Sequence, residues 1–222
     1  METLAAIQQR KSIRAYTDQP VKHEDIEEIL AIASRAPSGV NIQPWQVAVV
    51  QGQTKLAITE ALIAARRNKQ ETNPDYDYYP TEWEEPFNSR RIACGRALYE
   101  ALGIGRKERK KSQQQAWENN YRFFGAPVGF YFYIDRSLNK GSWIDMGMFI
   151  QNIMIAATAK GFGTCPQASV AEFPDIVRNI LGIDEQYILM CGMALGYTDT
   201  EQAVNQYRLP REPTDTFTRW FD

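Results

Sequence analysis

The chain has 222 residues and a mass of 25.4 kDa, and its 25 Lys and Arg against 27 Asp and Glu leave a formal charge of -2. A chain this long buries about 70 % of its unfolded surface, so it needs no disulfide scaffold. The near balance of charge argues against the basic excess that binds nucleic acid or an anionic membrane. No apolar run reaches the roughly 18 residues of a membrane helix and no signal peptide is visible, so we expect a cytoplasmic protein with no nucleic-acid and no membrane partner.

Ordinary catalytic side chains are scarce. The only histidine, His23, lies in a charged stretch at the start of a predicted helix, which disfavours hydrolases of the Ser-His-Asp or Cys-His type and zinc sites. The cysteines Cys94, Cys165 and Cys191 are odd in number and far apart, so they fit no metal or disulfide framework. With 12 % aromatic residues, the composition favours stacking on a flat ligand over hydrolysis.

In the first part of the chain, periodicity predicts three helices and one strand. Residues 2–10 form a short helix, and apolar residues recur at helical spacing from His23 until Pro37 stops the helix. Residues 47–50 are predicted to form a buried strand, and residues 54–68 another amphipathic helix.

Residues 69–118 differ in character, because many aromatic residues stand among charges. This composition indicates an inserted cap rather than core. Its basic run at 106–111 is interpreted as a solvated helix face, with nucleic-acid contact as the alternative.

The second half adds two strands and the most apolar helix. Strands are predicted at 128–134 and 187–195, and the helix at 142–160 is expected to be buried nearly all round, as a central or subunit-interface helix would be. From residue 200 the tail shows little periodicity. We therefore expect one layered domain of sheet and helices over residues 1–222.

No glycine-rich phosphate loop is present. Gly103–Gly105 and Gly161–Gly163 lack the third glycine of a dinucleotide fingerprint and are predicted to be helix stops. Arg10, Ser12 and Arg14 fall within five residues and can offer two guanidinium groups and a hydroxyl to a phosphate. Alone, this pattern is more often ordinary surface charge, and the same holds for the two arginines of the tail.

The loop from Pro37 to Trp45 carries short polar residues on a stiff Pro/Gly frame. Ser38 and Asn41 suit hydrogen bonding to a planar polar ligand. The alternative is a capped connection between a helix and a strand.

Together, these motifs resemble the FMN-dependent nitroreductase family. The resemblance rests on Arg-x-Ser-x-Arg from residue 10, Ala-Pro-Ser-Gly-x-Asn-x-Gln-Pro-Trp at 36–45, an apolar helix before Gly-Phe-Gly-Thr-Cys-Pro-Gln, and a late Arg-Glu-Pro. It is closest to the branch with a Cys-Pro-Gln loop and a long central insertion. The resemblance implies an α+β fold: a nitroreductase-like three-layer α-β-α sandwich whose central, mainly antiparallel sheet is flanked by helices, in an intertwined homodimer. Residues 69–118 would then be an inserted cap over the active site, and residues 200–222 an extended C-terminal tail.

The resemblance also implies an FMN site at the subunit interface. Its N-terminal motif and terminal basic residues bind the phosphate, the 37–41 loop comes from the second subunit, and the backbone after the apolar helix approaches flavin N5. The matching residues are Arg10, Lys11, Ser12, Arg14, Pro37, Ser38, Gly39, Asn41, Asn119, Arg122, Pro166, Gln167, Ala168, Ser169, Arg208 and Arg211.

Two assignments carry an alternative. Asn120 takes the place of Asn119 if the register shifts by one residue. Arg208 and Arg211 are three residues apart, whereas the family often spaces its two basic residues by two, so the role of Arg208 is left open.

The activity implied is a two-electron, ping-pong reduction of a nitroaromatic or quinone-like acceptor, with NADH or NADPH as electron donor. The flavin carries the chemistry, so no catalytic side chain and no metal are expected. Arg14 or Arg122 would stabilise the reduced ring electrostatically. The alternatives are a related dehalogenase or enone reductase, a family enzyme that consumes the flavin, or a non-catalytic flavin-binding protein. Cys165 adjoins the N5 loop as a small buried residue or as a redox thiol.

Overall fold

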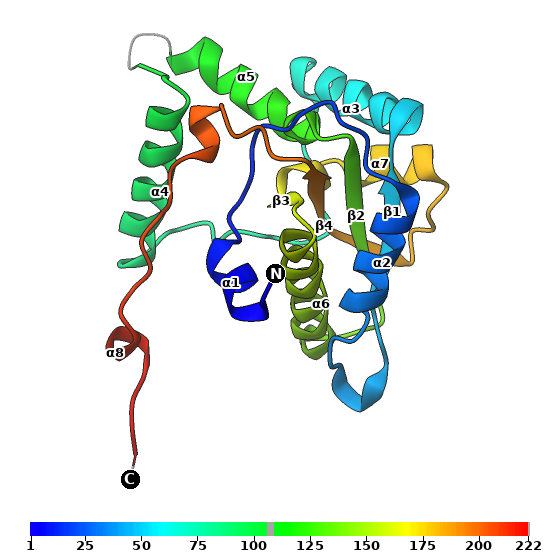
Figure 1. The fold of residues 1–222 in the computed structure, drawn as a ribbon. Helices are drawn as coiled ribbons and strands as arrows, with labels where there is room; N and C mark the ends of the chain where they lie inside the picture. The colour runs from blue at the N-terminus through cyan, green and yellow to red at the C-terminus, as the bar shows by residue number, and fades with distance from the viewer. Residues whose placement is uncertain (106–108, 222) are drawn as a thin grey trace.

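A computed structural model describes residues 1–105 and 109–221, without the side chains of 109–111. Its four strands form one antiparallel sheet in the order β1-β2-β4-β3 (Figure 1). The strands are β1 (Gln46–Val50), β2 (Val128–Asp135), β3 (Gly163–Gln167) and β4 (Tyr187–Gly196). The expected α+β class with an antiparallel sheet is confirmed.

Helices cover both faces of this sheet. The first face is covered by α2 and α6, and the second by α3 and α7, as the two buried clusters of apolar side chains show. In the described part of the chain the α-helices are α1 (Thr3–Gln9), α2 (His23–Ala33), α3 (Gly52–Arg67), α4 (Phe87–Ala101), α5 (Arg109–Tyr121), α6 (Lys140–Ala159), α7 (Pro174–Leu181) and α8 (Thr214–Phe217).

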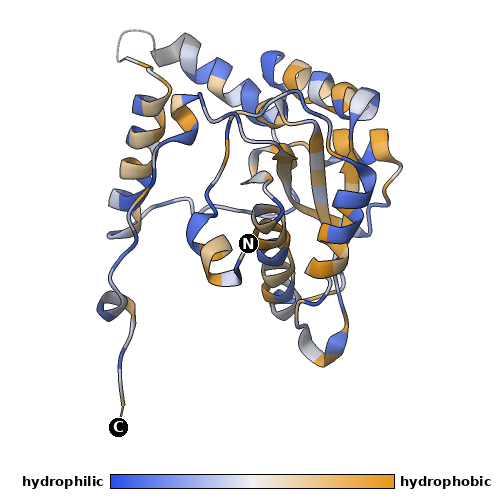
Figure 2. Ribbon diagram, in the orientation of Figure 1, coloured by the Kyte–Doolittle hydropathy of each residue, from blue (hydrophilic) through white to orange (hydrophobic). Residues whose placement is uncertain are grey.

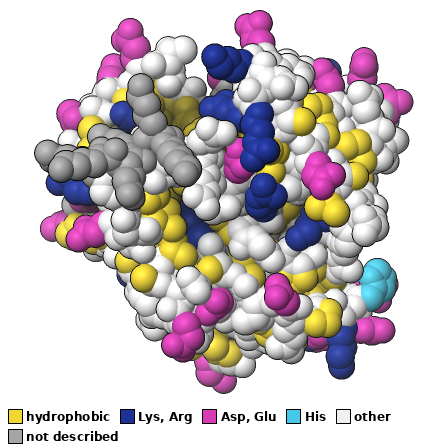
Figure 3. All heavy atoms as spheres, turned by 90° about the horizontal axis from the view of Figure 1, so that it is seen from above, with side chains coloured by type: hydrophobic (Ala, Val, Ile, Leu, Met, Phe, Trp, Pro, Cys, Tyr) yellow, Lys and Arg dark blue, Asp and Glu magenta, His cyan; other side chains and the backbone are white. Residues whose placement is uncertain are grey.

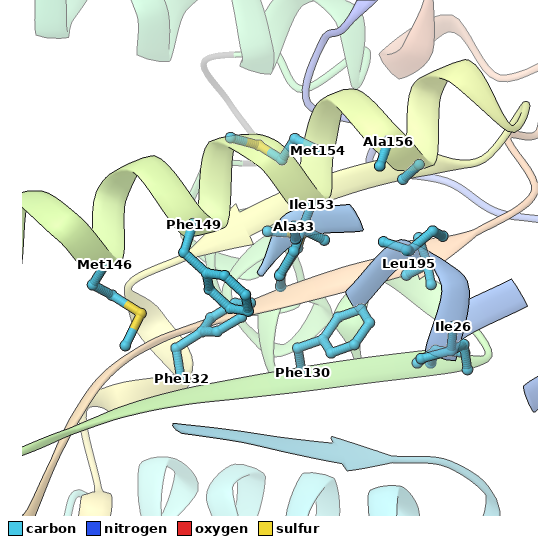
Figure 4. Packing of buried hydrophobic residues seen from close by; sticks show 14 of the residues in the cluster. Ile26, Ala33, Phe130, Phe132, Met146, Phe149, Ile153, Met154, Ala156 and Leu195 are labelled. Atoms are coloured by element: carbon cyan, nitrogen blue, oxygen red, sulfur yellow. The ribbon is translucent and has the colours of Figure 1, made fainter. Parts of the chain in front are cut away.

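The central strand β2 shows why the fold has three layers. Phe130 and Phe132 belong to the cluster under α2 and α6, and Figure 4 shows Phe149 of α6 pointing toward Phe132. The intervening Tyr131 and Tyr133 belong to the cluster on the opposite face. Because successive side chains of a strand point to opposite faces, a strand buried along its whole length needs cover on both sides.

Most predicted elements are confirmed within two residues, including the glycine helix stops. Gly103 and Gly161 follow α4 and α6 with φ of 66° and 87°, which glycine adopts without strain. The amphipathic prediction for α3 is visible in Figure 2, where hydrophilic and hydrophobic residues alternate along the helix. His23 is exposed at the start of α2 beside Glu27, as expected.

One expectation about burial was wrong and one strand was missed. The predicted buried strand is the edge strand β1, where Val49 is 40 % exposed. Helix α6 was expected to be buried nearly all round as a central or subunit-interface helix; its Ile144 is 68 % exposed within one chain, so burial at an interface stays a prediction. Strand β3 was not predicted, because its sequence Gly-Thr-Cys-Pro-Gln lacks the usual strand formers and alternation.

The segment expected to be an inserted cap divides into two parts. Residues 74–79 lie against the body of the fold, whereas α4 stands beside the C-terminal tail and has no buried residue (Figure 1). Arg90 of α4 contacts Glu212 of the tail at 3.2 Å. The predicted solvated helix face at 106–111 lies outside the described residues, because the structure describes neither residues 106–108 nor the side chains of 109–111.

Candidate active site

The N-terminal motif and the tail meet around a cavity of about 550 Å³, the cationic cavity. Backbone pairing holds the motif in place, since Ile13 N donates to Thr164 O of β3 at 2.9 Å. None of the described lining residues is Asp or Glu. The lining cations are Arg10, Lys11, Arg14, Arg208 and Arg211.

Asn205, which is 1 % exposed, joins the tail to the motif. Its side-chain oxygen accepts from Arg14 N at 2.8 Å, and its backbone oxygen accepts from Lys11 Nζ. Arg208 donates to Gln8 O and Gln9 O at 2.7 and 2.8 Å, at the end of α1. These contacts explain how residues nearly 200 positions apart form one cavity.

The cations perturb one another. Burial, followed by the charges of Arg211 and Arg208, lowers the pKa of Arg10. Burial and the charge of Arg208 lower the pKa of Lys11. An anion bound among these groups relieves the repulsion, so the cationic cavity has the chemistry of a phosphate site.

A second cavity of about 490 Å³, the aromatic cavity, shares Arg14 with the first. One part of its lining is residues 166–169, the end of β3 and the turn after it, and another comes from residues 74 and 76–79 and from Trp117 of α5. The hydroxyl of Tyr76 donates to Met190 O at 2.6 Å, which ties this second part to β4.

Hydrogen bonds also fix the indole of Trp117. Its Nε1 donates to the hydroxyl of Tyr121 at 3.2 Å, and that hydroxyl donates to Glu172 Oε2 at 2.6 Å. Arg66 lies over the indole at 4.6 Å from its ring centroid. The aromatic cavity is thus bordered by a positioned flat side chain, which suits a planar ligand.

Unpaired polar atoms lie at the end of β3 and in the turn that follows it. Gln167 Oε1 and Ser169 Oγ are buried, and neither has a hydrogen-bond partner among the described residues. The other end of the Gln167 amide donates to Asn120 O at 2.7 Å. A buried polar group without a partner costs about 1–3 kcal/mol, so a polar ligand in this cavity would offset a real deficit.

Most residues expected at one site meet at the two cavities. The cationic cavity contains Ser12 besides its cations, and the aromatic cavity is lined by Arg14, Pro166, Gln167, Ala168 and Ser169.

Asn119 and Arg122, both expected at the site, line neither cavity. Asn120 lines the aromatic cavity, whereas Asn119 is exposed, which favours the shifted register. Arg122 is exposed and contacts Glu118 at 3.7 Å.

The loop residues Pro37, Ser38, Gly39 and Asn41 also lie apart from the two cavities. Gly39 N donates to Asp145 of α6 at 3.2 Å, and the loop is otherwise largely exposed. Val40 has φ of 45° and is 96 % exposed, an unfavourable left-handed conformation for a β-branched residue. Such strain is typical of binding segments and interfaces.

Cys165 is 1 % exposed, and burial raises its pKa. A buried thiol held in its neutral form is a poor redox group, which favours the interpretation as a small core residue.

Some site residues were missed from the sequence. Asn205 and Tyr207 bind Arg14 but belong to the tail, where no periodicity marks them. The wall at 74–79 lies in the insertion, whose density of tyrosines was the one available signal.

Comparisons with known proteins agree on one family. A model described as "Nitroreductase family" matches residues 7–197. The 4-nitrobenzoate reductase of Pseudomonas putida is 35 % identical, over 97 % of this chain and 94 % of that protein. The chloronitrobenzene nitroreductase of Comamonas testosteroni is 36 % identical, over 96 % of this chain and 93 % of that protein.

Solved structures give the same result. The FMN and NADPH-dependent nitroreductase NfnB from Sphigopyxis sp. strain HMH superposes with a TM-score of 0.97 at 38 % identity, over 100 % of both chains. NfnB from Mycobacterium smegmatis in complex with NADPH gives a TM-score of 0.92 at 32 % identity, also over 100 % of both chains. In the described part of this chain, no helix is long and apolar enough to cross a membrane.

Proposed function

Because the chain belongs to the nitroreductase family, we propose that it is an FMN-dependent NAD(P)H oxidoreductase that reduces nitroaromatic or quinone-like acceptors. The observation that carries this proposal is the pair of cavities that share Arg14. One is cationic and suits a phosphate, while the other is flat-walled and polar at one edge. Such a pair fits the two ends of a flavin mononucleotide.

We propose that the cations of the first cavity hold the FMN phosphate. In the second cavity, Gln167 Oε1 and Ser169 Oγ would meet the polar edge of the ring, together with the backbone at Ala168. When bound, FMN supplies two-electron transfer between a nicotinamide and the acceptor, in a ping-pong sequence. Arg14 stabilises the negative charge that reduction adds, and no side chain needs to act as nucleophile.

We also propose a homodimer with FMN sites at its interface. Three exposed features support it: the strained loop at 37–41, Ile144 on α6, and α4 with no buried residue. The 37–41 loop of the second subunit would complete the site, as the resemblance to the nitroreductase family implies. In this arrangement, residues 1–222 form a single domain, 69–118 border the active site and 200–222 form the tail.

The cofactor experiment compares flavin content among variants. Purified protein should be yellow, and Arg10→Ala with Arg211→Ala should lose the flavin absorbance. Lys22→Ala, which removes an exposed cation outside both cavities, is the matched control and should keep it. A colourless wild type that does not take up added FMN would refute the cofactor assignment.

Turnover and assembly are tested separately. Nicotinamide oxidation coupled to loss of a nitroarene distinguishes the oxidoreductase from a flavin-binding protein, since the latter binds FMN without turnover. Sedimentation of a monomer at micromolar concentration would contradict the interface site.

A further inference from the structure

A third cavity of about 480 Å³, the outer cavity, is also lined by Trp117. Among the described residues, Trp117 is the one that the linings of this cavity and the aromatic cavity share, so the two cavities are neighbours. Figure 3 shows Lys and Arg side chains gathered on the face seen from above, where α3 and α5 lie in Figure 1. The lining residues are Arg66, Arg67, Lys69, Tyr99, Gln113, Gln114 and Trp117.

The outer cavity combines cations, amides and aromatic rings, and none of its described lining residues is acidic. Arg67 Nε and Nη2 donate to the two oxygens of Glu118 at 2.9 and 2.8 Å, which holds the guanidinium in a fixed position. Arg66 is held over the indole of Trp117. By contrast, Lys69 makes no ion pair within the described residues.

The backbone at Lys69 has a conformation that disfavours any residue with a Cβ atom. Helix α3 ends in a Schellman motif, in which Gln70 N donates to Ala65 O at 3.0 Å and Lys69 N donates to Arg66 O at 3.1 Å. Lys69 occupies the left-handed position of this motif, with φ of 55°. Glycine is the usual residue there because a Cβ atom is disfavoured. A lysine at this position therefore costs stability, a pattern typical of binding residues.

We propose that the outer cavity binds the phosphorylated adenosine end of NADPH, with Lys69 contacting the 2′-phosphate. This proposal rests on the proposed function, in which the nicotinamide enters the aromatic cavity. A dinucleotide that passes Trp117 reaches both cavities at once. Lys69 supplies a positive charge that no acid pairs within the described residues, whereas Arg66 and Arg67 also contact Glu172 and Glu118. The ring of Tyr99 offers a face for the adenine. The enzyme accordingly prefers NADPH to NADH.

The sharpest test is Lys69→Gly, because binding and stability should change in opposite directions. Glycine relieves the left-handed backbone, so Tm should rise by about 2–4 °C. Loss of the phosphate contact should raise KM for NADPH about ten-fold, with kcat and KM for NADH nearly unchanged. Lys69→Gln should show the same loss of NADPH affinity without the gain in Tm. Lys22→Gln, an exposed lysine outside the cavities, is the matched control.

Direct binding gives a readout that is independent of turnover. Titration calorimetry of the flavin-loaded protein should show adenosine 2′,5′-bisphosphate binding about ten-fold tighter than 5′-AMP, with the difference lost in Lys69→Gln. Equal kcat/KM for NADPH and NADH in the wild type would overturn the proposal. So would an equal effect of Lys69→Gln on both nucleotides, since that places another phosphate at Lys69. If the proposed function itself is wrong, the result is different, because neither NADPH nor NADH would then reduce the protein.

Discussion

The wall of the aromatic cavity depends on a buried carboxylate, and Asp75→Asn tests that dependence. Asp75 lies within the wall segment 74–79 but does not line the cavity. Its Oδ2 accepts from Leu189 N at 2.8 Å and from Arg178 Nη2, and its Oδ1 accepts from Arg136 Nη2 at 2.9 Å. The side chains of Asp75 and Arg178 are 9 % and 5 % exposed. Asp75 is therefore a positioning residue that fixes the cavity wall to β4 and α7.

The structure sets the size of the expected effect. Removing one partner of a buried ion pair costs about 3–5 kcal/mol. The low end applies here, because Arg178 Nη1 keeps Asp175 at 3.2 Å and an asparagine can still accept from Leu189 N. A loss of about 3 kcal/mol lowers Tm by about 6–12 °C in a chain of this size.

Stability and kinetics together give the assay for Asp75→Asn. Thermal unfolding should show the fall in Tm, and KM for the nitroarene should rise more than kcat falls, while flavin content stays normal. Arg136→Gln is the matched control, because its side chain is 48 % exposed and its loss should cost no more than about 1 kcal/mol. Equal Tm values for Asp75→Asn and Arg136→Gln would refute the reasoning. A normal nitroarene KM in a destabilised Asp75→Asn would limit Asp75 to a structural role.

Three further predictions concern other sites. Gly163→Ala places a Cβ atom 2.5 Å from Thr198 Oγ1 and 2.7 Å from Ile13 Cγ1, so it should cost about 1–3 kcal/mol and reduce flavin content by displacing the N-terminal motif; unchanged flavin content would contradict this. The hydrogen bond from Arg67 lowers the pKa of Glu118 from its ordinary value of 4.5, so its stabilisation is present above that pH and is lost as pH falls through the lower folded value. When the pH falls below 4.5, the free energy of unfolding of Glu118→Gln should therefore decrease less than that of the wild type, as measured by acid unfolding. Arg14→Gln should make the reduction potential of bound flavin more negative, measured by anaerobic dye equilibration, and an unchanged potential would place the compensating charge elsewhere.

Local pattern predicted the framework of this protein well. The apolar runs that became β2, β4 and α6 are long and bounded by clear turn signals, so propensity and tertiary packing agree there. Strand β3 was missed because its residues pair for a tertiary reason: β4 supplies one edge and Ser12 bridges to the other. Burial was also misjudged at β1, since a sequence does not say which strand lies at the edge of its sheet.

For the candidate site too, the sequence is informative only where the residues that act together are close in the chain. The motif at 10–14 stands out in the sequence because its two arginines and its serine lie within five residues, and its role in cofactor binding stays a prediction. The sequence left the choice between Asn119 and Asn120 open. Neighbouring positions of a helix point about 100° apart, and packing decides which of them faces the rest of the protein. In the structure, Asn120 O accepts a hydrogen bond from the Gln167 amide, and Asn119 is exposed.

The net charge of the chain gives no sign of its cationic cavity. The chain sums to -2, yet the cationic cavity contains five cations and no described acid. Other acids pair with arginines outside this cavity, as Glu118 does with Arg67 and Arg122. Because Coulomb repulsion among clustered cations opposes folding, such a cluster is stable chiefly when a bound anion compensates it. Flavin binding and folding should therefore be coupled, and the protein should unfold at a lower temperature once FMN is removed.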